Sequence, residues 1–308
     1  MAKRDFRTLF DISRDEVLKV IDSAIALKEG KLKFSMPPLQ GKTLAMIFLK
    51  SSTRTRISFE VGMYQLGGYA LFLSSRDIQL GRGETIADTA RVLSRFCDAI
   101  MARVFGHSDI EELAEYASVP VINGLSDKHH PCQALADFQT IKEKKGKLKG
   151  VKLAYVGDGN NVCHSLIEAA AMVGAEISVA APKGYEPAKD VVKNAEKEAK
   201  KTGARISIMN DAFAAVKDAD AVYTDVWASM GQEDEAEERK KIFAPYQVNA
   251  ELLKAAKPDA IVLHCLPAHR GEEITDEVID GPKSVVFDQA ENRLHVQKAL
   301  LLLLFGKI

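Results

Sequence analysis

Hydrophobic positions along this 308-residue chain form short continuous runs that alternate with stretches of helical spacing. Continuous apolar runs bounded by polar turns predict buried strands, and apolar residues repeating every three or four positions predict amphipathic helices. In the first half, strands are expected at 42–49, 70–73, 99–104 and 119–122. Helices are expected at 15–30, 53–65, 86–96, 109–117 and from 131 to about 145.

The charged, glycine-containing stretch KEKKGKLKG at 142–150 interrupts this pattern and predicts a domain boundary. We therefore expect one domain over 1–147 and a second over 148–308. Beyond the boundary the alternation restarts, with strands at 151–156, 176–180, 205–209, 221–223, 260–263 and 284–287 and helices at 162–173, 187–200 and about 290–304.

This order of elements predicts an α/β fold in two domains, each with a mostly parallel sheet flanked by helices. The last helix, at about 290–304, contains the run ALLLLLF and is apolar on too many sides to be exposed all round. We therefore expect it to pack back on the first domain or against another subunit.

Composition and charge exclude several classes of protein. The chain is 46% hydrophobic and 28% charged, so it can form a core and is not a disordered chain. Its net charge of -1 argues against a dedicated nucleic-acid binder. The longest apolar run, at 299–305, is too short to span a membrane, no signal peptide is recognisable, and four scattered cysteines do not form a secreted disulfide framework. A cytoplasmic location is expected.

The segment SSTRTR at 51–56 follows a predicted buried strand and opens a predicted helix. Ligands bind at the carboxyl ends of strands in open α/β sheets, and the unpaired N–H groups of a helix N-terminus suit a phosphate. Hydroxyl groups are added by Ser52, Thr53 and Thr55. Arg54 adds a guanidinium group that can donate two parallel hydrogen bonds to one phosphate. The segment therefore predicts a phosphate site, with a capped helix and two exposed arginines as the alternative.

Two further segments of the first half carry polar groups of this kind. Arg103 ends an apolar strand, where it could face the same anion or simply reach solvent. In HHPCQ at 129–133, Pro131 fits a first helical turn and places His130 and Gln133 near one face. Residue spacing leaves two interpretations open, a polar helix cap and a pair of groups that bind a carbonyl and an amide.

The glycine-rich segment VGDGNN at 156–161 follows the first strand of the second half. A dinucleotide site requires a third small residue and an acidic residue about 20 positions later. Val162 stands where the third small residue belongs, and the next strand ends in Ala180 and Ala181. The incomplete fingerprint argues against a nicotinamide cofactor, whereas an anion or carboxylate held through Asn161 remains open.

Two later segments also follow predicted strands. Asp225, in DVWASMG, could hold a cationic amine or cap a loop, and the polar run after it predicts a mobile lid. In HCLPAHR, three residues resemble metal ligands, but neither a C-x-x-C nor a second histidine pair accompanies them, which argues against zinc. Cys265 could act as a nucleophile, although no oxyanion elbow surrounds it and a positioning role is equally consistent.

Together, six segments resemble the aspartate/ornithine carbamoyltransferase family, most closely its ornithine members. Each segment alone is common, but their shared order across nearly the whole chain is specific. They are STRTR at 52–56, MARV at 101–104, HPCQ at 130–133, D-x-x-x-S-M-G at 225–231, HCLP at 264–267 and Arg293.

The resemblance implies a carbamoyl-phosphate domain followed by an ornithine domain, and a homotrimer or multiple of trimers with shared active sites. It implies no metal or organic cofactor, no nucleic acid and no membrane. The carbamoyl-phosphate ligands it implies are Ser52, Thr53, Arg54, Thr55, Arg103, His130, Pro131, Cys132, Gln133 and Arg293, with Gln79 reaching a neighbouring subunit's phosphate. The ornithine ligands it implies are Asn161, Asp225, Ser229, Met230, Cys265 and Leu266, and the catalytic residues are Cys265, Arg54, Arg103 and His130.

The function implied is transfer of the carbamoyl group to the side-chain amine of L-ornithine, giving citrulline and phosphate in arginine metabolism. Carbamoyl phosphate is already activated, so direct attack by the amine needs no covalent enzyme intermediate. Alternatives are a carbamoyltransferase for putrescine, acetylornithine or aspartate, and a non-catalytic phosphate-binding homologue. Asp225 would repel an aspartate side chain, and putrescine lacks a carboxylate for Asn161 to bind.

Overall fold

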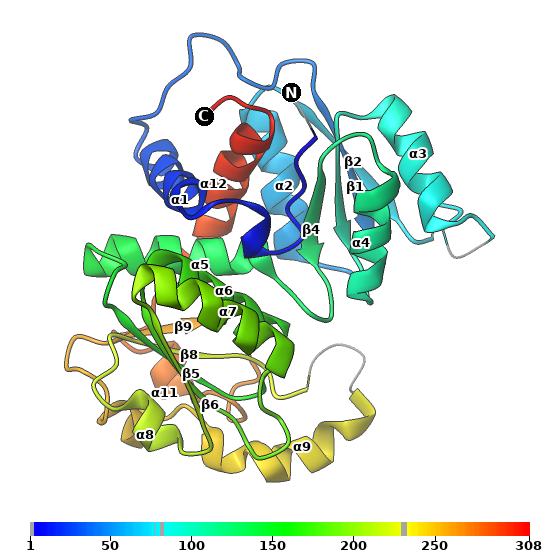
Figure 1. The fold of residues 1–308 in the computed structure, drawn as a ribbon. Helices are drawn as coiled ribbons and strands as arrows, with labels where there is room; N and C mark the ends of the chain where they lie inside the picture. The colour runs from blue at the N-terminus through cyan, green and yellow to red at the C-terminus, as the bar shows by residue number, and fades with distance from the viewer. Residues whose placement is uncertain (1–2, 77, 81–82, 229–232) are drawn as a thin grey trace. The chain divides into compact units, whose positions relative to one another are not determined.

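The computed structural model describes residues 3–76, 78–80, 83–228 and 233–308. The chain divides into two compact units, one formed by Met1–Gln139 with Glu291–Ile308 and the other by Thr140–Ala290 (Figure 1). The C-terminal segment therefore belongs to the first unit. The boundary expected between residues 147 and 148 stays a prediction.

The first unit contains a parallel four-stranded sheet in the order β2-β1-β3-β4. The register places Phe48, the last residue of β1, opposite Arg103, the last residue of β3. The elements are η1 (Leu9–Asp11), α1 (Arg14–Lys28), β1 (Thr43–Phe48), α2 (Thr53–Gln65), β2 (Tyr69–Ser74), α3 (Ile86–Phe96), β3 (Ala99–Arg103), α4 (His107–Tyr116), β4 (Val121–Leu125) and α5 (Pro131–Lys145).

The core of the first unit lies on both faces of this sheet. On one face, Ile47 and Ile100 pack in one buried cluster with Ile110 and Leu113 of α4. Figure 1 shows α3 and α4 on this side and α2 with the C-terminal helix α12 (Val286–Leu304) on the other. Burial between two helical layers explains why β1 and β3 are continuous apolar runs rather than alternating ones.

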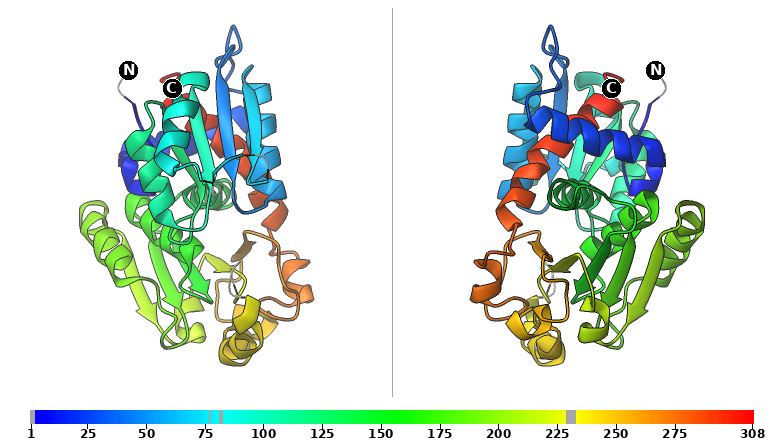
Figure 2. Two further views of the ribbon diagram at one scale, coloured as in Figure 1. Left: turned by 90° about the vertical axis from the view of Figure 1, so that its right-hand side faces the viewer. Right: turned by 90° about the vertical axis from the view of Figure 1, so that its left-hand side faces the viewer.

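Helix α12 packs within the first unit through polar as well as apolar contacts. The Lys28 ammonium of α1 and the Gln139 amide of α5 both donate to Asn292 Oδ1, at 2.8 and 3.0 Å. Gly62 of α2 faces Leu294 and Lys298, which come close enough that a side chain there would touch them. Figure 2 shows α12 (red) beside α1 (dark blue). The expectation that the last helix packs back on the first domain is confirmed.

The second unit contains a parallel five-stranded sheet in the order β7-β6-β5-β8-β9. Its elements are β5 (Lys152–Val156), α6 (Asn161–Val173), β6 (Glu176–Ala180), α7 (Lys189–Thr202), β7 (Arg205–Met209), α8 (Ala212–Val216), β8 (Ala221–Thr224), η2 (Glu233–Glu235), α9 (Ala236–Phe243), η3 (Ala244–Tyr246), α10 (Ala250–Leu253), β9 (Ile261–His264) and α11 (Asp276–Ile279). With the first unit, these elements confirm the predicted α/β fold in two domains.

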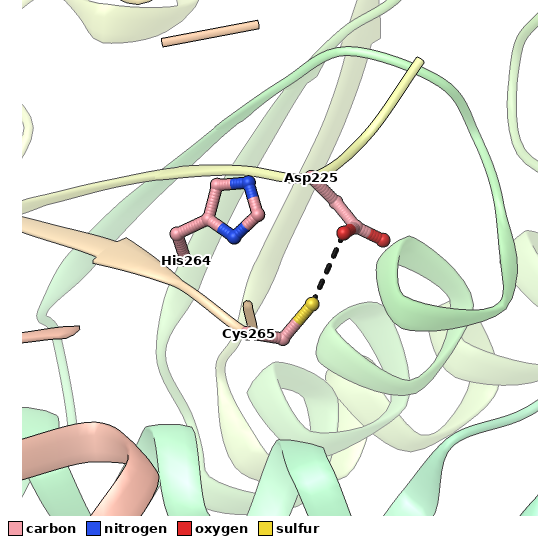
Figure 3. A group of neighbouring side chains, drawn as sticks. All are labelled: Asp225, His264 and Cys265. Atoms are coloured by element: carbon pink, nitrogen blue, oxygen red, sulfur yellow. Dashed lines mark hydrogen bonds between the residues drawn. The ribbon is translucent and has the colours of Figure 1, made fainter. Parts of the chain in front are cut away.

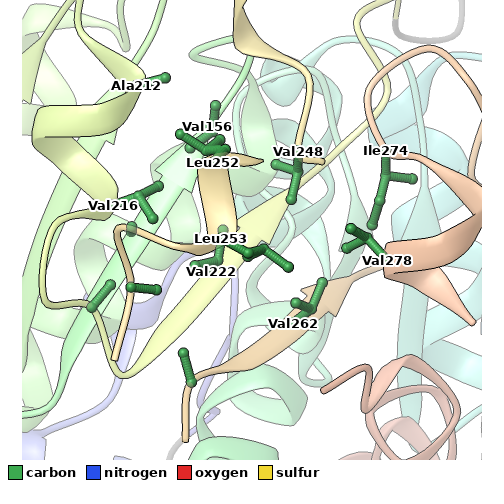
Figure 4. Close-up of a cluster of buried hydrophobic side chains, with 14 of the residues drawn as sticks. Val156, Ala212, Val216, Val222, Val248, Leu252, Leu253, Val262, Ile274 and Val278 are labelled. Carbon is green, nitrogen blue, oxygen red and sulfur yellow. The ribbon is translucent and has the colours of Figure 1, made fainter. Parts of the chain in front are cut away.

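One face of the second sheet forms a buried aliphatic cluster with the short helices α8, α10 and α11 (Figure 4). Val156, Val222 and Val262 extend from three strands toward Leu252 and Val278 of the helices. The β-branched strand residues pack well on a pleated surface, which favours strand formation over helix formation at these positions.

The strand predicted at 284–287 is wrong. Ser284 forms only an isolated bridge with Val262, and α12 already begins at Val286, about four residues before the predicted start. The Val-Val-Phe sequence favours a strand locally, but burial of Val286 in the aliphatic cluster stabilises a helical start instead. In the parts of the chain that the structure describes, no helix combines the length and the apolar character required to cross a membrane.

Candidate active site

Both sheets have a position where neighbouring strands are followed by connections that run in opposite directions. In the first sheet this position lies between β1 and β3, and in the second it lies between β5 and β8. Ligands bind at such switch points, at the carboxyl ends of the strands. The predicted site segments 51–56 and 101–104 follow or end the first pair, and 156–161 and 225–231 follow the second pair.

In the first unit, the N-terminus of α2 lies at the carboxyl end of β1. Ser52 is the N-cap residue, and its hydroxyl accepts from the Thr55 N–H at 3.2 Å. Leu49 N–H donates to the Arg103 carbonyl at 2.9 Å, which ties the end of β1 to the end of β3. The remaining N–H groups of the first turn and the helix dipole make this a favourable location for an anion.

Three arginines surround the buried histidine that precedes α5. His130 is 5% exposed, and its pKa is held well below the ordinary value by burial and by the positive charges of Arg293, Arg103 and Arg54. His130 is therefore neutral near pH 7 and can donate one hydrogen bond without adding charge. Residues from four segments of the chain thus form one cationic cluster in the first unit.

Arg293 of α12 is 2% exposed and is oriented by two side chains. Its Nη1 donates to Gln133 Oε1 at 2.7 Å, and its Nη2 donates to Thr55 Oγ1 at 3.3 Å. Gln133 Nε2 in turn donates to Asp137 Oδ1 at 2.8 Å. The amide of Gln133 thus fixes an arginine of the cationic cluster.

The two residues after His130 carry no charge near neutral pH, and the first of them begins helix α5. Pro131 is the first residue of α5, where its fixed φ angle and missing N–H cost nothing. Burial raises the pKa of the Cys132 thiol to about 12, although the charge of Arg293 lowers it. Cys132 therefore remains a protonated thiol near neutral pH.

Other residues of these segments point elsewhere. Arg56 donates from Nε to Glu60 Oε1 at 3.1 Å, and its guanidinium carbon lies 3.7 Å from the centre of the Phe72 ring. These contacts separate it from Arg54, which belongs to the cationic cluster.

Gln79 is exposed in the connection between β2 and α3.

In the second unit, the two glycines of the VGDGNN segment meet requirements of the backbone itself. Gly157 adopts φ +142, which L residues rarely reach. A Cβ on Gly159 would lie 2.3 Å from the Pro187 backbone nitrogen, so this space is already filled by protein. The carboxylate of Asp158, between the two glycines, pairs with Arg239 at 3.1 Å.

Beside this turn lies a buried carboxylate with two neutral donors. Asp225, directly after β8, is 5% exposed and accepts from Asn160 Nδ2 at 2.8 Å. Its other oxygen accepts from the Cys265 thiol at 3.0 Å (Figure 3). Among the described residues, no lysine, arginine or histidine forms an ion pair with Asp225. A buried carboxylate of this kind favours binding of a cationic group.

A second network holds the segment that carries Cys265. The Leu266 N–H donates to His264 Nδ1 at 2.9 Å, so the opposite ring nitrogen carries the proton and donates to Glu273 Oε1 at 3.0 Å. Leu266 adopts φ +59, an uncommon conformation for a residue with a side chain. The network stabilises this turn and so positions the thiol.

Ligand atoms of Asp225, His264 and Cys265 lie within 4.8 Å of one another, which is compatible with a metal ion. However, both nitrogens of His264 are engaged in the hydrogen bonds just described. A metal would have to displace one of them. The arrangement favours a role of His264 in positioning.

Some residues escaped sequence reasoning. The sequence analysis points to Asn161, the first residue of α6, and misses its neighbour Asn160. Asn160 is the N-cap, and its Oδ1 accepts from the N–H groups of Val162 and Cys163, which leaves Nδ2 to contact Asp225. The preference of asparagine for N-caps was the available signal. Ser229 and Met230 lie outside the described residues.

The two α/β units carry a cationic cluster beside one sheet and a buried carboxylate beside the other, an arrangement suited to a transferase with an anionic donor and an amine acceptor. Comparison with known proteins agrees with this class. Residues 4–143 match the family model for the carbamoyl-P binding domain of aspartate/ornithine carbamoyltransferase, and residues 149–304 match the Asp/Orn binding domain. The chain belongs to the aspartate/ornithine carbamoyltransferase family.

Individual relatives are similar over their full lengths. An ornithine carbamoyltransferase of Thermococcus kodakarensis is 63% identical, covering 100% of this chain and 98% of the relative. The solved structure of ornithine carbamoyltransferase from Pyrococcus furiosus superposes with a TM-score of 0.94 at 62% identity, covering 100% of this chain and 98% of that one. The corresponding structure from Thermus thermophilus has a TM-score of 0.88 at 44% identity and covers 99% of both chains.

Proposed function

We propose that the protein transfers the carbamoyl group of carbamoyl phosphate to the side-chain amine of L-ornithine, giving citrulline and phosphate. The observation that carries this proposal is the buried Asp225 carboxylate, whose described partners are neutral donors. Such a group favours an acceptor with an amine on its side chain and disfavours aspartate. The names of the relatives support the same acceptor.

The cationic cluster of the first unit is suited to the phosphate and carbonyl groups of the donor. In this proposal Ser52, Thr53 and the α2 N-terminus bind phosphate oxygens with Arg54. Neutral His130 donates to the carbonyl oxygen, and Arg103 and Arg293 stabilise the negative charge that develops there. The full set proposed for carbamoyl phosphate is Ser52, Thr53, Arg54, Thr55, Arg103, His130, Pro131, Cys132, Gln133 and Arg293, with Gln79 from a neighbouring subunit.

On the acceptor side, Asp225 would bind and orient the ornithine side-chain amine together with the Cys265 thiol. Asn161 and Leu266, with Ser229 and Met230, complete the proposed ornithine ligands. The bound ammonium first loses one proton to solvent, and the nitrogen lone pair of the resulting amine then forms a bond to the carbonyl carbon, giving a tetrahedral intermediate. The bond from that carbon to the phosphate oxygen then breaks, and the departing phosphate takes the amine proton. No residue of the enzyme forms a covalent bond to the carbamoyl group in this sequence of steps.

We further propose a homotrimer or multiple of trimers, a cytoplasmic location and a biosynthetic role. Exposed apolar side chains on α2 and on the edge strand β2, including Tyr64, Tyr69 and Leu71, support association between copies. None of the four cysteines, all of which the structure describes, forms a disulfide, as is usual in a reducing compartment. One relative, from Pyrococcus furiosus, is named anabolic.

The test is citrulline formation from carbamoyl phosphate and ornithine, with putrescine, acetylornithine and aspartate as parallel acceptors. We expect carbamoylation of ornithine with a specificity constant at least about a hundredfold above that for any other amine, because buried polar groups left unpaired are costly. Equal or greater activity with another amine would contradict the acceptor assignment. Phosphate release without any carbamoylated amine would contradict the proposed transfer itself.

A further inference from the structure

Arg239 of α9 is a buried arginine that no sequence motif singled out. It is 6% exposed. Its Nη1 donates to Asp158 Oδ2 at 3.1 Å and to the Trp227 carbonyl oxygen at 2.9 Å. Its Nε donates to Glu235 Oε2 at 3.0 Å. A charge is retained in a protein interior only where such partners compensate for its lost hydration.

The two segments that Arg239 connects are those that form the carboxylate site. Asp158 lies in the turn after β5, two residues before Asn160, and Trp227 lies two residues after Asp225. The hydrogen bond from Asn160 to Asp225, at 2.8 Å, joins the same two segments. Arg239 therefore forms a second connection beside the one that orients the Asp225 carboxylate.

Aromatic side chains enclose the Arg239 guanidinium. Its central carbon lies 5.0 Å from the centre of the Tyr185 ring and 6.0 Å from that of Phe243. Phe243 also stacks on Trp227, with ring centres 6.1 Å apart. The planar guanidinium can lie against these rings while donating along its edge, which a lysine ammonium does not reproduce.

We propose that Arg239 is a positioning residue for the acceptor amine. It holds the turn after β5 and the segment after β8 at the separation that lets Asn160 aim the Asp225 carboxylate. The inference rests on the proposed function, in which Asp225 binds the ornithine amine. Arg239 acts through Asp158 and Trp227 and makes no contact with substrate.

This role predicts a selective change in kinetics. Loss of the guanidinium misdirects Asp225 and weakens ornithine binding, so Arg239→Met should raise the KM for ornithine about tenfold or more. The residues proposed for carbamoyl phosphate belong to the other unit, so the KM for carbamoyl phosphate should stay within about twofold. A merely structural role would lower kcat, through fewer folded molecules, and leave both KM values unchanged.

The matched control is Lys240→Met, at the adjacent position of the same helix. Lys240 is solvent-accessible and pairs with Glu237 and Glu272, at 3.1 and 3.2 Å, so its loss should change neither KM. An ornithine KM within about twofold of wild type in folded Arg239→Met would overturn the proposal. The wild-type enzyme in the same assay tests the proposed function separately, because it retains Arg239.

A charge-conserving variant keeps the test decisive if Arg239→Met does not fold. Arg239→Lys retains the positive charge for Asp158 but loses the planar fork. We expect an ornithine KM between those of wild type and Arg239→Met, raised at least about threefold, with the carbamoyl phosphate KM unchanged. Wild-type values for both substrates in Arg239→Lys would contradict the positioning role in that case.

Discussion

Replacement of Asp225 by asparagine removes the charge of the proposed amine site while keeping its shape. The asparagine oxygen can still accept from Asn160, which now donates across 2.8 Å to the carboxylate. The side-chain amide can turn its NH₂ group toward Cys265, whose sulfur lies 3.0 Å from the other carboxylate oxygen. The fold should therefore tolerate the change, and the effect should fall on the substrate.

The size of the effect follows from the hydrogen bonds involved. Hydrogen bonds to charged groups contribute about 1.5–3 kcal/mol, against about 0.5–1.5 kcal/mol for neutral pairs. Because the amide also presents donors toward the amine, we expect a loss near the upper end, about 2–3 kcal/mol of transition-state stabilisation. This corresponds to a decrease of about 30- to 160-fold in kcat/KM for ornithine.

The assay is citrulline formation at saturating carbamoyl phosphate, with thermal unfolding of each variant as the check on folding. Asp220→Asn is the matched control, because Asp220 precedes the opposite end of β8 and pairs with Lys257 at 2.6 Å. It should leave kcat/KM within about twofold of wild type. A folded Asp225→Asn enzyme that keeps kcat/KM within about threefold would refute the assignment of Asp225 to the amine.

Three further changes test other parts of the structure. Arg293→Met should lower kcat about 10- to 100-fold in steady-state kinetics, since a charged donor to the charge that develops on the carbonyl oxygen is lost; an unchanged kcat would remove Arg293 from the site. Burial raises the pKa of Asp158 from 3.8 to about 6, so the unfolded chain loses this proton first as the pH rises. The free energy of unfolding should therefore fall by about 2.4 kcal/mol between pH 4 and pH 7 through this group, and denaturant titrations should show that slope reduced in Asp158→Asn. Gly159→Ala should lower the free energy of unfolding by about 1–3 kcal/mol because its Cβ would meet the Pro187 backbone, and an unchanged melting temperature would contradict this.

Much of the local structure could be predicted from residue patterns. Helix α2 begins and ends at the predicted residues 53 and 65, because Ser52 caps its start and two glycines follow its end. The strands around which the sites form are apolar runs in the sequence, so the sequence alone predicts that Arg103 and Asp225 lie at strand ends. At 284–287, by contrast, a β-branched run suggested a strand where packing stabilises the start of α12.

What the sequence determined by itself is therefore the set of elements and the chemistry placed at their ends, since caps, turns and hydrophobic periodicity act between residues near in the chain. Only the tertiary structure decided which of these groups meet. Arg293 reaches Thr55 across 238 positions of sequence, and Arg239 reaches Asp158 across 81. No local pattern encodes such contacts, because they depend on how the strands are ordered in each sheet and on where α12 packs.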